Sequence, residues 1–246
     1  PGGSPEAPRG HEVPDAPVTA YPATLDPGDQ GAGTVPAATA AATLRPPTTP
    51  GASEEVADLF ADIDHDGGQF QSLLEPLGGD VLSLADMSVI EEFEETGATF
   101  AENARIKAIS YSRLVPFPVV ADDSGLEVAA LGGRPGVHSA RYAGAGASDA
   151  ARVEKLLKEL AQTGGGRDAR FVCSLAVARD GVLLYESEGQ CPGVICGAPR
   201  GTLGFGYDPV FLLPDLGKTL AELTDAEKNR LSHRARAVAA LLRQLL

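Results

Sequence analysis

Residues 171–188 read FVCSLAVARDGVLLYESE, and this stretch predicts two β-strands, Phe171–Arg179 and Val182–Glu188. The residues between them, Asp180-Gly181, are typical of a tight hairpin turn, because both tolerate the positive φ that such a turn requires. Strands joined by so short a turn run antiparallel. The sheet of this protein therefore contains at least one antiparallel pair.

Helices and further strands alternate along the chain on either side of this hairpin. Capping boxes begin at Thr99 and Thr224, each with a glutamate three residues later, and predict helix starts. The other expected elements are a strand at 81–84, a strand at 118–121 that stops at 122–125, and a helix from 148 to about 162. This interleaving predicts an α/β protein with a mixed sheet.

Composition bounds the class of protein. The chain has 246 residues, 43% of them apolar and 22% charged, which excludes disorder throughout. No apolar run approaches the ~18 residues of a membrane span, so we expect no membrane partner. Of the 19 prolines, 11 lie in residues 1–50, which show neither helical nor strand periodicity. We therefore expect a disordered tail at 1–52 and a folded domain at 53–246.

The formal net charge of −14 disfavours nucleic acid as a partner, because an acidic surface repels a phosphate backbone. A local basic pocket can still hold a small nucleotide. Three cysteines form no even disulfide framework, and no secretory signal is visible. These features predict a cytoplasmic location.

Two acidic motifs are candidates for chemistry. Asp122 and Asp123 follow a hydrophobic strand, at the strand end where α/β proteins gather ligands. Since neighbours on a strand point to opposite faces, we expect at most one of them to face a given site. An ordinary turn explains the same residues. Asn103 and Lys107 share one helical face, which is either functional or simply solvated.

Two further motifs lie towards the C-terminus. The glycines and aromatics of residues 201–209 suit either a flat ligand or a glycine-rich loop whose aromatic rings fill the core. On one straight helix, His233 and Arg234 do not share a face with Lys228. If all three serve one ligand, the helix breaks and Ser232 caps a last helix. The alternative is a continuous amphipathic helix.

In this order and spacing, the motifs closely resemble the inosine/xanthosine triphosphate pyrophosphatase family. The matching blocks are 95–104 with 107–108, then 121–128, 132–133 and 135–144, and finally 199–201, 204–211 and 228–234. The resemblance runs from about Leu73 to the C-terminus. It implies hydrolysis of noncanonical purine nucleoside triphosphates (ITP, dITP and XTP) to the monophosphate and pyrophosphate.

The resemblance also implies roles for individual residues. It makes Asp123 the proton acceptor that activates water and, with Glu95, a ligand of Mg²⁺. The residues implied to bind substrate are Ser124, Lys107, Phe205, Gly206, Tyr207, Asp208, Lys228, His233 and Arg234. The family's fold is an elongated mixed β-sheet flanked by helices in two lobes with a central cleft, and the family is usually a homodimer.

One departure from the family pattern concerns its first phosphate loop. A gapless match places Ile63 and Asp66 where asparagine and lysine are expected, and an acidic residue there has the wrong sign of charge for phosphate. We therefore expect the first ~68 residues to be atypical, including the first ~15 of the predicted domain. Two other functions stay open at this point: nucleotide binding with impaired turnover, and a phosphomonoesterase that uses Asp122 and Asp123.

Overall fold

The computed structural model describes residues 41–45, 73–74, 80–83, 89 and 91–245. The chain divides into two compact units, residues 1–33 and 34–246, and every described residue belongs to the second. The described strands are β1 (Ala41–Arg45), β2 (Asp80–Ser83), β3 (Val119–Val128), β4 (Asp168–Arg179), β5 (Val182–Ile195), β6 (Phe211–Leu213) and β7 (Lys218–Thr219). The α-helices among these residues are α2 (Phe100–Tyr111), α3 (Asp149–Thr163), α4 (Asp225–Leu231) and α5 (His233–Leu245). Four short 3₁₀ helices join them: η2 (Ala129–Leu131), η3 (Gly136–Arg141), η4 (Asp208–Val210) and η5 (Leu220–Glu222).

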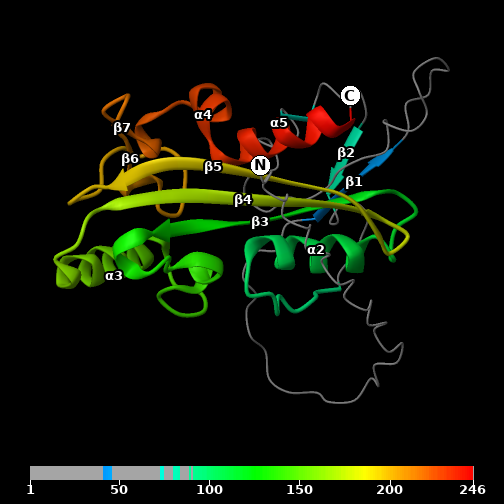
Figure 1. The fold of residues 1–246 in the computed structure, drawn as a ribbon, viewed down its shortest axis with the longest axis horizontal. Helices are drawn as coiled ribbons and strands as arrows, with labels where there is room; N and C mark the ends of the chain where they lie inside the picture. Colours follow the sequence, from blue (N-terminus) through cyan, green and yellow to red (C-terminus); the bar gives the residue numbers. More distant parts are fainter. Residues whose placement is uncertain (1–40, 46–72, 75–79, 84–88, 90, 246) are drawn as a thin grey trace, which may run out of the picture. The chain divides into compact units, whose positions relative to one another are not determined.

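The described strands form one sheet in the order β2-β1-β3-β4-β5-β6-β7 (Figure 1). The expected α/β class, a sheet flanked by helices, is confirmed. Every pairing among these strands is antiparallel, however, so the parallel pair of a mixed sheet is not found there. The connection from β3 to β4 leaves and re-enters the sheet at one end, where Val128 pairs with Ala169, and this makes the central pair antiparallel.

Two predicted boundaries are wrong. The strand expected to stop at Asp122 continues to Val128, because residues 122–125 pair in register with β4. Residues 41–45, expected within a disordered tail, form β1, whose backbone pairs with the edge of β3. The rest of that tail and the divergent phosphate-loop segment lie outside the described residues, so the domain boundary at 52/53 stays a prediction.

Most of the local predictions are confirmed. The hairpin turn at Asp180 and Gly181 has the expected positive φ values of 52° and 78°. Thr99 and Thr224 make complete capping boxes at the starts of α2 and α4. The side chain of Ser148 caps α3. None of the described helices is both long enough and apolar enough to cross a bilayer.

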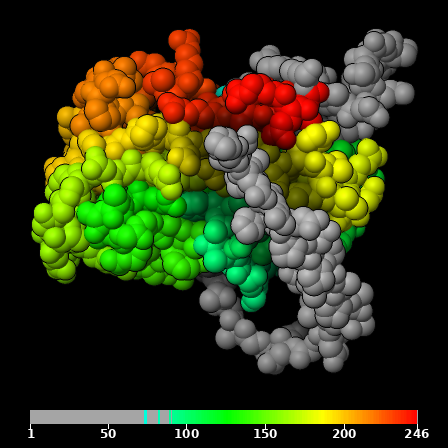
Figure 2. All heavy atoms as spheres, viewed as in Figure 1, coloured from blue at the N-terminus to red at the C-terminus, as the bar shows by residue number. Residues whose placement is uncertain are grey.

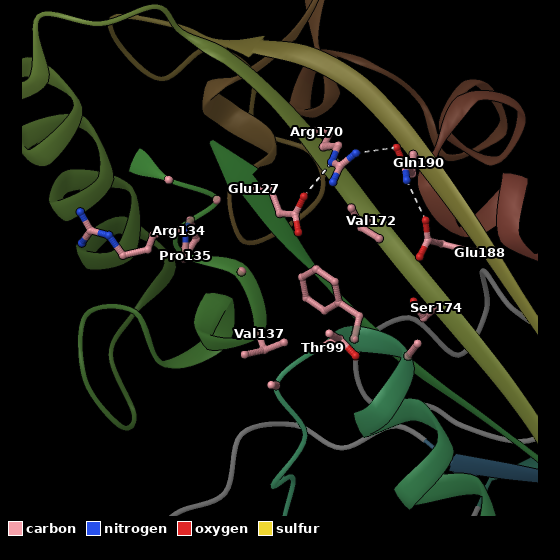
Figure 3. Close-up of a pocket in the computed structure, with 16 residues that line it drawn as sticks. Thr99, Glu127, Arg134, Pro135, Val137, Arg170, Val172, Ser174, Glu188 and Gln190 are labelled. Carbon is pink, nitrogen blue, oxygen red and sulfur yellow. Dashed lines mark hydrogen bonds and ion pairs between the residues drawn. The ribbon is translucent and has the colours of Figure 1, made fainter. Parts of the chain in front are cut away.

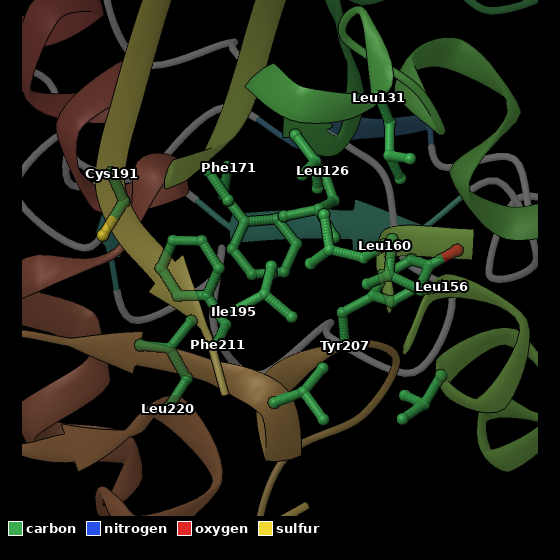
Figure 4. Close-up of a cluster of buried hydrophobic side chains, with 14 of the residues drawn as sticks. Leu126, Leu131, Leu156, Leu160, Phe171, Cys191, Ile195, Tyr207, Phe211 and Leu220 are labelled. Carbon is green, nitrogen blue, oxygen red and sulfur yellow. The ribbon is translucent and has the colours of Figure 1, made fainter. Parts of the chain in front are cut away.

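Separate hydrophobic clusters pack at the two ends of the long strands. One cluster joins Leu126 and Phe171 to Leu156 of α3 (Figure 4). At the other end, Val177 of β4 packs against Leu241 of α5. Beneath α2 the cluster consists of alanines, including Ala104, Ala108, Ala121, Ala176 and Ala178. These small side chains let α2 lie close to β3. The polar residues of α2, Asn103 and Lys107, are thereby brought next to the strand.

Helix α5 packs on β5 with its first turn against Gly189, and the space-filling view shows the atoms of α5 next to those of β5 (Figure 2). A Cβ on Gly189 would lie 2.1 Å from the carbonyl oxygen of His233, so only glycine permits this approach. Arg236 donates to the Gln190 carbonyl at 2.9 Å, and Gln244 to that of Glu186 at 2.8 Å. These bonds hold α5 on β5, opposite α2 across the sheet, and so place His233 (Figure 1).

Candidate active site

One cavity of about 390 Å³ is lined by every residue to which the sequence analysis assigned a role. These residues come from the segment before α2, from β3, from the helices α2, α4 and α5, and from the loop that leads into η4. They are Glu95, Lys107, Asp123, Ser124, Phe205, Gly206, Tyr207, Asp208, Lys228, His233 and Arg234. Motifs more than 130 residues apart in sequence thus meet in one place.

A second cavity of about 400 Å³ lies beside the start of α2. Polar side chains along one wall bond in series: Arg170 donates to Glu127 at 2.6 Å and to Gln190 at 3.1 Å (Figure 3). Gln190 in turn donates to Glu188 at 2.7 Å. The first cavity is the stronger candidate for a site that binds a charged ligand, because it gathers the residues to which the sequence assigned roles.

Two side chains of α2 hold the carboxylate of Asp123. The Nδ2 of Asn103 donates to Asp123 Oδ2 at 3.1 Å, while Asn103 Oδ1 accepts from the Gly97 N–H at 2.7 Å. One turn further on, Lys107 Nζ lies 3.3 Å from Asp123 Oδ1 and 3.2 Å from Glu95 Oε1. The helical face shared by Asn103 and Lys107 is therefore buried against the carboxylates rather than solvated.

The electrostatics of this cluster favour a carboxylate that can take up a proton. Burial raises the pKa of Asp123 to about 6, Lys107 opposes that shift, and the negative charge of Glu95 adds to it. Burial lowers the pKa of Lys107, but the charges of Asp123 and Glu95 outweigh it and hold this pKa above the ordinary lysine value. At neutral pH Lys107 is a fixed cation beside a carboxylate of near-neutral pKa.

Asp122 and Ser124 contact the other side of the site. Asp122 Oδ2 accepts from Ser124 Oγ at 2.5 Å and lies 3.5 Å from Arg234 Nε. The predicted alternation holds, since Asp123 contacts α2 whereas Asp122 contacts α5. Both carboxylates nevertheless line the same cavity, so the expectation that only one faces the site is wrong. The cavity reaches residues on both faces of β3.

The loop at 201–209 combines both interpretations offered for its aromatic residues. Tyr207 is only 4% exposed and belongs to the core, with its hydroxyl donating to the Ser139 carbonyl at 2.9 Å. Phe205 is 37% exposed, and Lys228 Nζ lies 4.4 Å from its ring centroid. One ring anchors the loop, and the other is available to a flat ligand.

Asp208 fixes the shape of this loop. Its Oδ2 accepts from the Phe205 N–H at 3.1 Å and from Lys228 Nζ at 2.7 Å. A Cβ on Gly204 would lie 2.2 Å from that oxygen, and the φ of Gly204 is +73°. The buried Asp208–Lys228 ion pair therefore requires glycine at position 204.

The helix break predicted at Ser232 is confirmed. Helix α4 ends at Leu231, Ser232 is extended with ψ 159°, and its Oγ accepts from the Ala235 N–H at 3.2 Å as the cap of α5. His233 then stacks on Phe171, with ring centroids 4.8 Å apart. Burial, together with the charges of Arg234 and Lys228, holds the pKa of His233 well below its usual value. Its Nδ1 has no hydrogen-bond partner among the described residues.

Several residues that line the cavity were given no role by the sequence analysis. Arg141 Nη1 lies 3.9 Å from Glu95 Oε2. The ring of Phe171 stacks on the imidazole of His233. Asp149 and Arg152 reach the cavity from the first turns of α3. The sequence around them predicts only a helix start after Ser148, and this does not reveal the contact between Asp149 and Gly206.

The donor set suits magnesium that arrives with a phosphate ligand. No group of three or more His, Cys, Asp or Glu side chains in the described part of the chain is arranged to hold a metal. Mg²⁺ is usually held by one or two carboxylates, with water and substrate phosphates as its other ligands. Glu95 and Asp123 already share one cation, the ammonium of Lys107, so their carboxylates fit this role.

Fold and site together define an α/β protein whose cavity sets a carboxylate cluster beside an aromatic loop, with Lys228 and Arg234 next to the Phe205 ring. The model of the Ham1 family matches residues 61–244, and the chain belongs to that family. It is 54% identical over 174 residues to the dITP/XTP pyrophosphatase of Geobacillus kaustophilus, covering 70% of this chain and 85% of the relative. The Bacillus subtilis protein of the same name is 51% identical over 178 residues, covering 72% and 90%.

Solved structures show the same relationship. A HAM1 protein from Coxiella burnetii superposes with a TM-score of 0.68 at 39% identity, covering 76% of this chain and 96% of that one. The nucleoside-triphosphatase, or dITP/XTP pyrophosphatase, of Mycobacterium abscessus gives 0.60 at 41% identity, with 73% and 93% covered.

Proposed function

We propose that this protein hydrolyses the noncanonical purine nucleoside triphosphates ITP, dITP and XTP to the monophosphate and pyrophosphate, with Mg²⁺ as cofactor. The observation that carries this proposal is the meeting, in one cavity, of the Glu95–Lys107–Asp123 cluster with Phe205 and Lys228. The first group suits phosphate chemistry and the second suits a purine ring. The names of the relatives support the same reaction.

Asp123 acts as the base in this proposal. Hydrolysis requires a group that removes a proton from the attacking water, and a base works best when its pKa lies near the working pH. Burial gives Asp123 such a pKa, at about 6. Asn103 and Lys107 each hold one of its carboxylate oxygens, so the group is oriented before the substrate arrives.

Glu95 and Asp123 would hold the Mg²⁺. When bound, the ion supplies charge neutralisation on the phosphate oxygens. Lys107 adds a fixed positive charge, and the hydroxyl of Ser124 a polar contact, next to these carboxylates. Arg234, on the α5 side, offers a further cation for the triphosphate.

The loop at 205–208 selects the nucleobase, together with Lys228 and His233, and Arg234 lies between this loop and the carboxylates. Phe205 stacks on the purine, and the cations beside its ring favour keto oxygens over the 6-amino group of adenine and the 2-amino group of guanine. A mismatched base leaves a buried donor or acceptor unpaired, at a cost of about 1–3 kcal/mol per contact. That cost corresponds to roughly tenfold to hundredfold selectivity.

The products of ITP hydrolysis test this proposal. We expect equimolar inosine monophosphate and pyrophosphate in the presence of Mg²⁺, and no turnover once the metal is chelated, because the carboxylates and the triphosphate then repel each other. Anion-exchange chromatography of the products makes the measurement. Orthophosphate as the first product would favour a phosphomonoesterase instead. The homodimer and the cytoplasmic location stay predictions.

A further inference from the structure

Asp149 and Arg152 connect the start of α3 to two loops around the cavity. Asp149 Oδ2 accepts from the Gly206 N–H at 2.6 Å. Its other oxygen, Oδ1, pairs with Nη2 of Arg152, while Nη1 of Arg152 donates to the Ala140 carbonyl. The two side chains thus join the 204–208 loop to η3 through α3.

The 204–208 loop needs such external support. Gly204 and Gly206 both have positive φ, at 73° and 58°, and glycine restricts the backbone least of all residues. The loop is also held by the Tyr207 hydroxyl on Ser139, by the Asp208 carboxylate on Lys228 and by the Phe205 N–H on Asp208. The Gly206 N–H takes part in none of these contacts, and its acceptor is Asp149.

The ion pair between Asp149 and Arg152 is explained better by a role in positioning the loop than by a contribution to core packing. The Arg152 side chain is 20% exposed, and its Nε is buried without a hydrogen-bond partner in the described part of the chain. A largely buried cation with an unsatisfied donor is costly, and it is tolerated where a carboxylate holds it. Asp149 supplies that carboxylate with one oxygen and keeps the other for the loop.

We propose that Asp149 and Arg152 are positioning residues for nucleobase recognition: Asp149 holds Gly206 so that the neighbouring Phe205 ring lies against the purine, and Arg152 orients Asp149. This inference rests on the proposed function, because it assigns the 205–208 loop to the base. It goes beyond that proposal by adding two residues of α3 to the specificity apparatus.

In this proposal the loop contacts the nucleobase rather than the reacting phosphates. Loss of the Asp149 contact should therefore weaken nucleotide binding and leave the chemical step unchanged. Loss of a contact made equally in the ground state and the transition state raises KM and leaves kcat unchanged. The Asp149 variants should bind purine nucleotides more weakly than the unchanged protein does. They should bind pyrophosphate, which has no nucleobase, equally well.

The test is calorimetric binding of inosine monophosphate and of pyrophosphate, each with Mg²⁺, to the full chain and three variants. Asp149→Ala removes the acceptor of the Gly206 N–H, and Asp149→Asn keeps an acceptor oxygen but loses the ion pair with Arg152. Glu154→Ala is the matched control, because Glu154 is an exposed carboxylate on the same helix. The melting temperature and the KM and kcat for ITP are measured in parallel.

We expect Asp149→Ala to weaken monophosphate binding and to raise KM by about tenfold, the loss typical of one hydrogen bond to a charged group. Asp149→Asn should restore part of this affinity, and Glu154→Ala should have no effect. Pyrophosphate affinity and kcat should stay within about twofold of the unchanged protein in every variant.

Unchanged monophosphate affinity in Asp149→Ala, or an equal loss for monophosphate and pyrophosphate, would overturn the inference. If Asp149→Ala does not fold, Asp149→Asn carries the test through the lost ion pair with Arg152, with a smaller loss of monophosphate affinity expected and again none for pyrophosphate. If the unchanged protein neither binds the monophosphate nor hydrolyses ITP, the proposed function fails first and this inference falls with it. If the unchanged protein does both and the variants match it, the inference alone fails.

Discussion

Asp123→Asn is expected to reduce kcat for ITP by about 10²–10⁴-fold, the contribution typical of a general base. The amide neither accepts the proton of the attacking water nor holds Mg²⁺ well, yet it has nearly the same shape as the carboxylate. The melting temperature should therefore change little. Release of pyrophosphate, followed at saturating ITP, measures the effect.

Asp122→Asn is the matched control for this substitution, because Asp122 is the adjacent carboxylate in the same cavity but contacts α5. Its loss of kcat should be clearly milder. Activity of Asp123→Asn within tenfold of the unchanged protein would contradict its role as the base. Equal losses at both positions would contradict the division of roles between the two faces of β3.

Lys107→Met is expected to reduce both turnover and stability. Lys107 is the cation that Glu95 and Asp123 share at 3.2 and 3.3 Å. Removing one partner from a buried ion pair costs about 3–5 kcal/mol, since the remaining charge stays uncompensated. At roughly 2–4 °C per kcal/mol for a domain of this size, the melting temperature should fall by about 6–20 °C. Lys158→Met, at an exposed position on α3, is the control and should change neither quantity.

The stability deficit of Lys107→Met should depend on pH. The folded pKa of Asp123, about 6, lies above its ordinary value of 3.8, so the folded state binds the proton more tightly than the unfolded state. Without the lysine that opposes this shift, the folded pKa rises further. The variant should therefore regain stability as the pH falls from 7 towards 4, measured by denaturant unfolding. A deficit that is constant across this range would contradict the assigned electrostatics.

The sequence predicted best those features that neighbouring residues determine. A capping box depends on four consecutive residues, as at Thr99, and a hairpin turn on the pair Asp180-Gly181. The break at Ser232 also followed from local geometry, because one straight helix does not bring Lys228 and His233 to the same ligand. All three are present in the structure.

Features that depend on distant partners were missed. Asp122-Asp123-Ser124-Gly125 has the composition of a turn, but pairing with β4 about 50 residues later keeps it extended. The role of Asp149 is invisible for the same reason, because its partner Gly206 lies 57 residues away. The sequence motifs identified most of the residues that line the cavity. The side chains that hold those residues in position, such as Asp149, are found only in the folded structure.

The most direct measurement of the proposed activity is kcat/KM for a panel of purine triphosphates with Mg²⁺. We expect dITP, ITP and XTP to be hydrolysed with an efficiency at least about a hundredfold above that for ATP, GTP and their deoxy forms, because each unpaired contact costs a wrong base about tenfold to hundredfold. Pyrophosphate should be released in each case. Equal efficiencies across the panel, or tight binding of ITP without turnover, would contradict the proposed function.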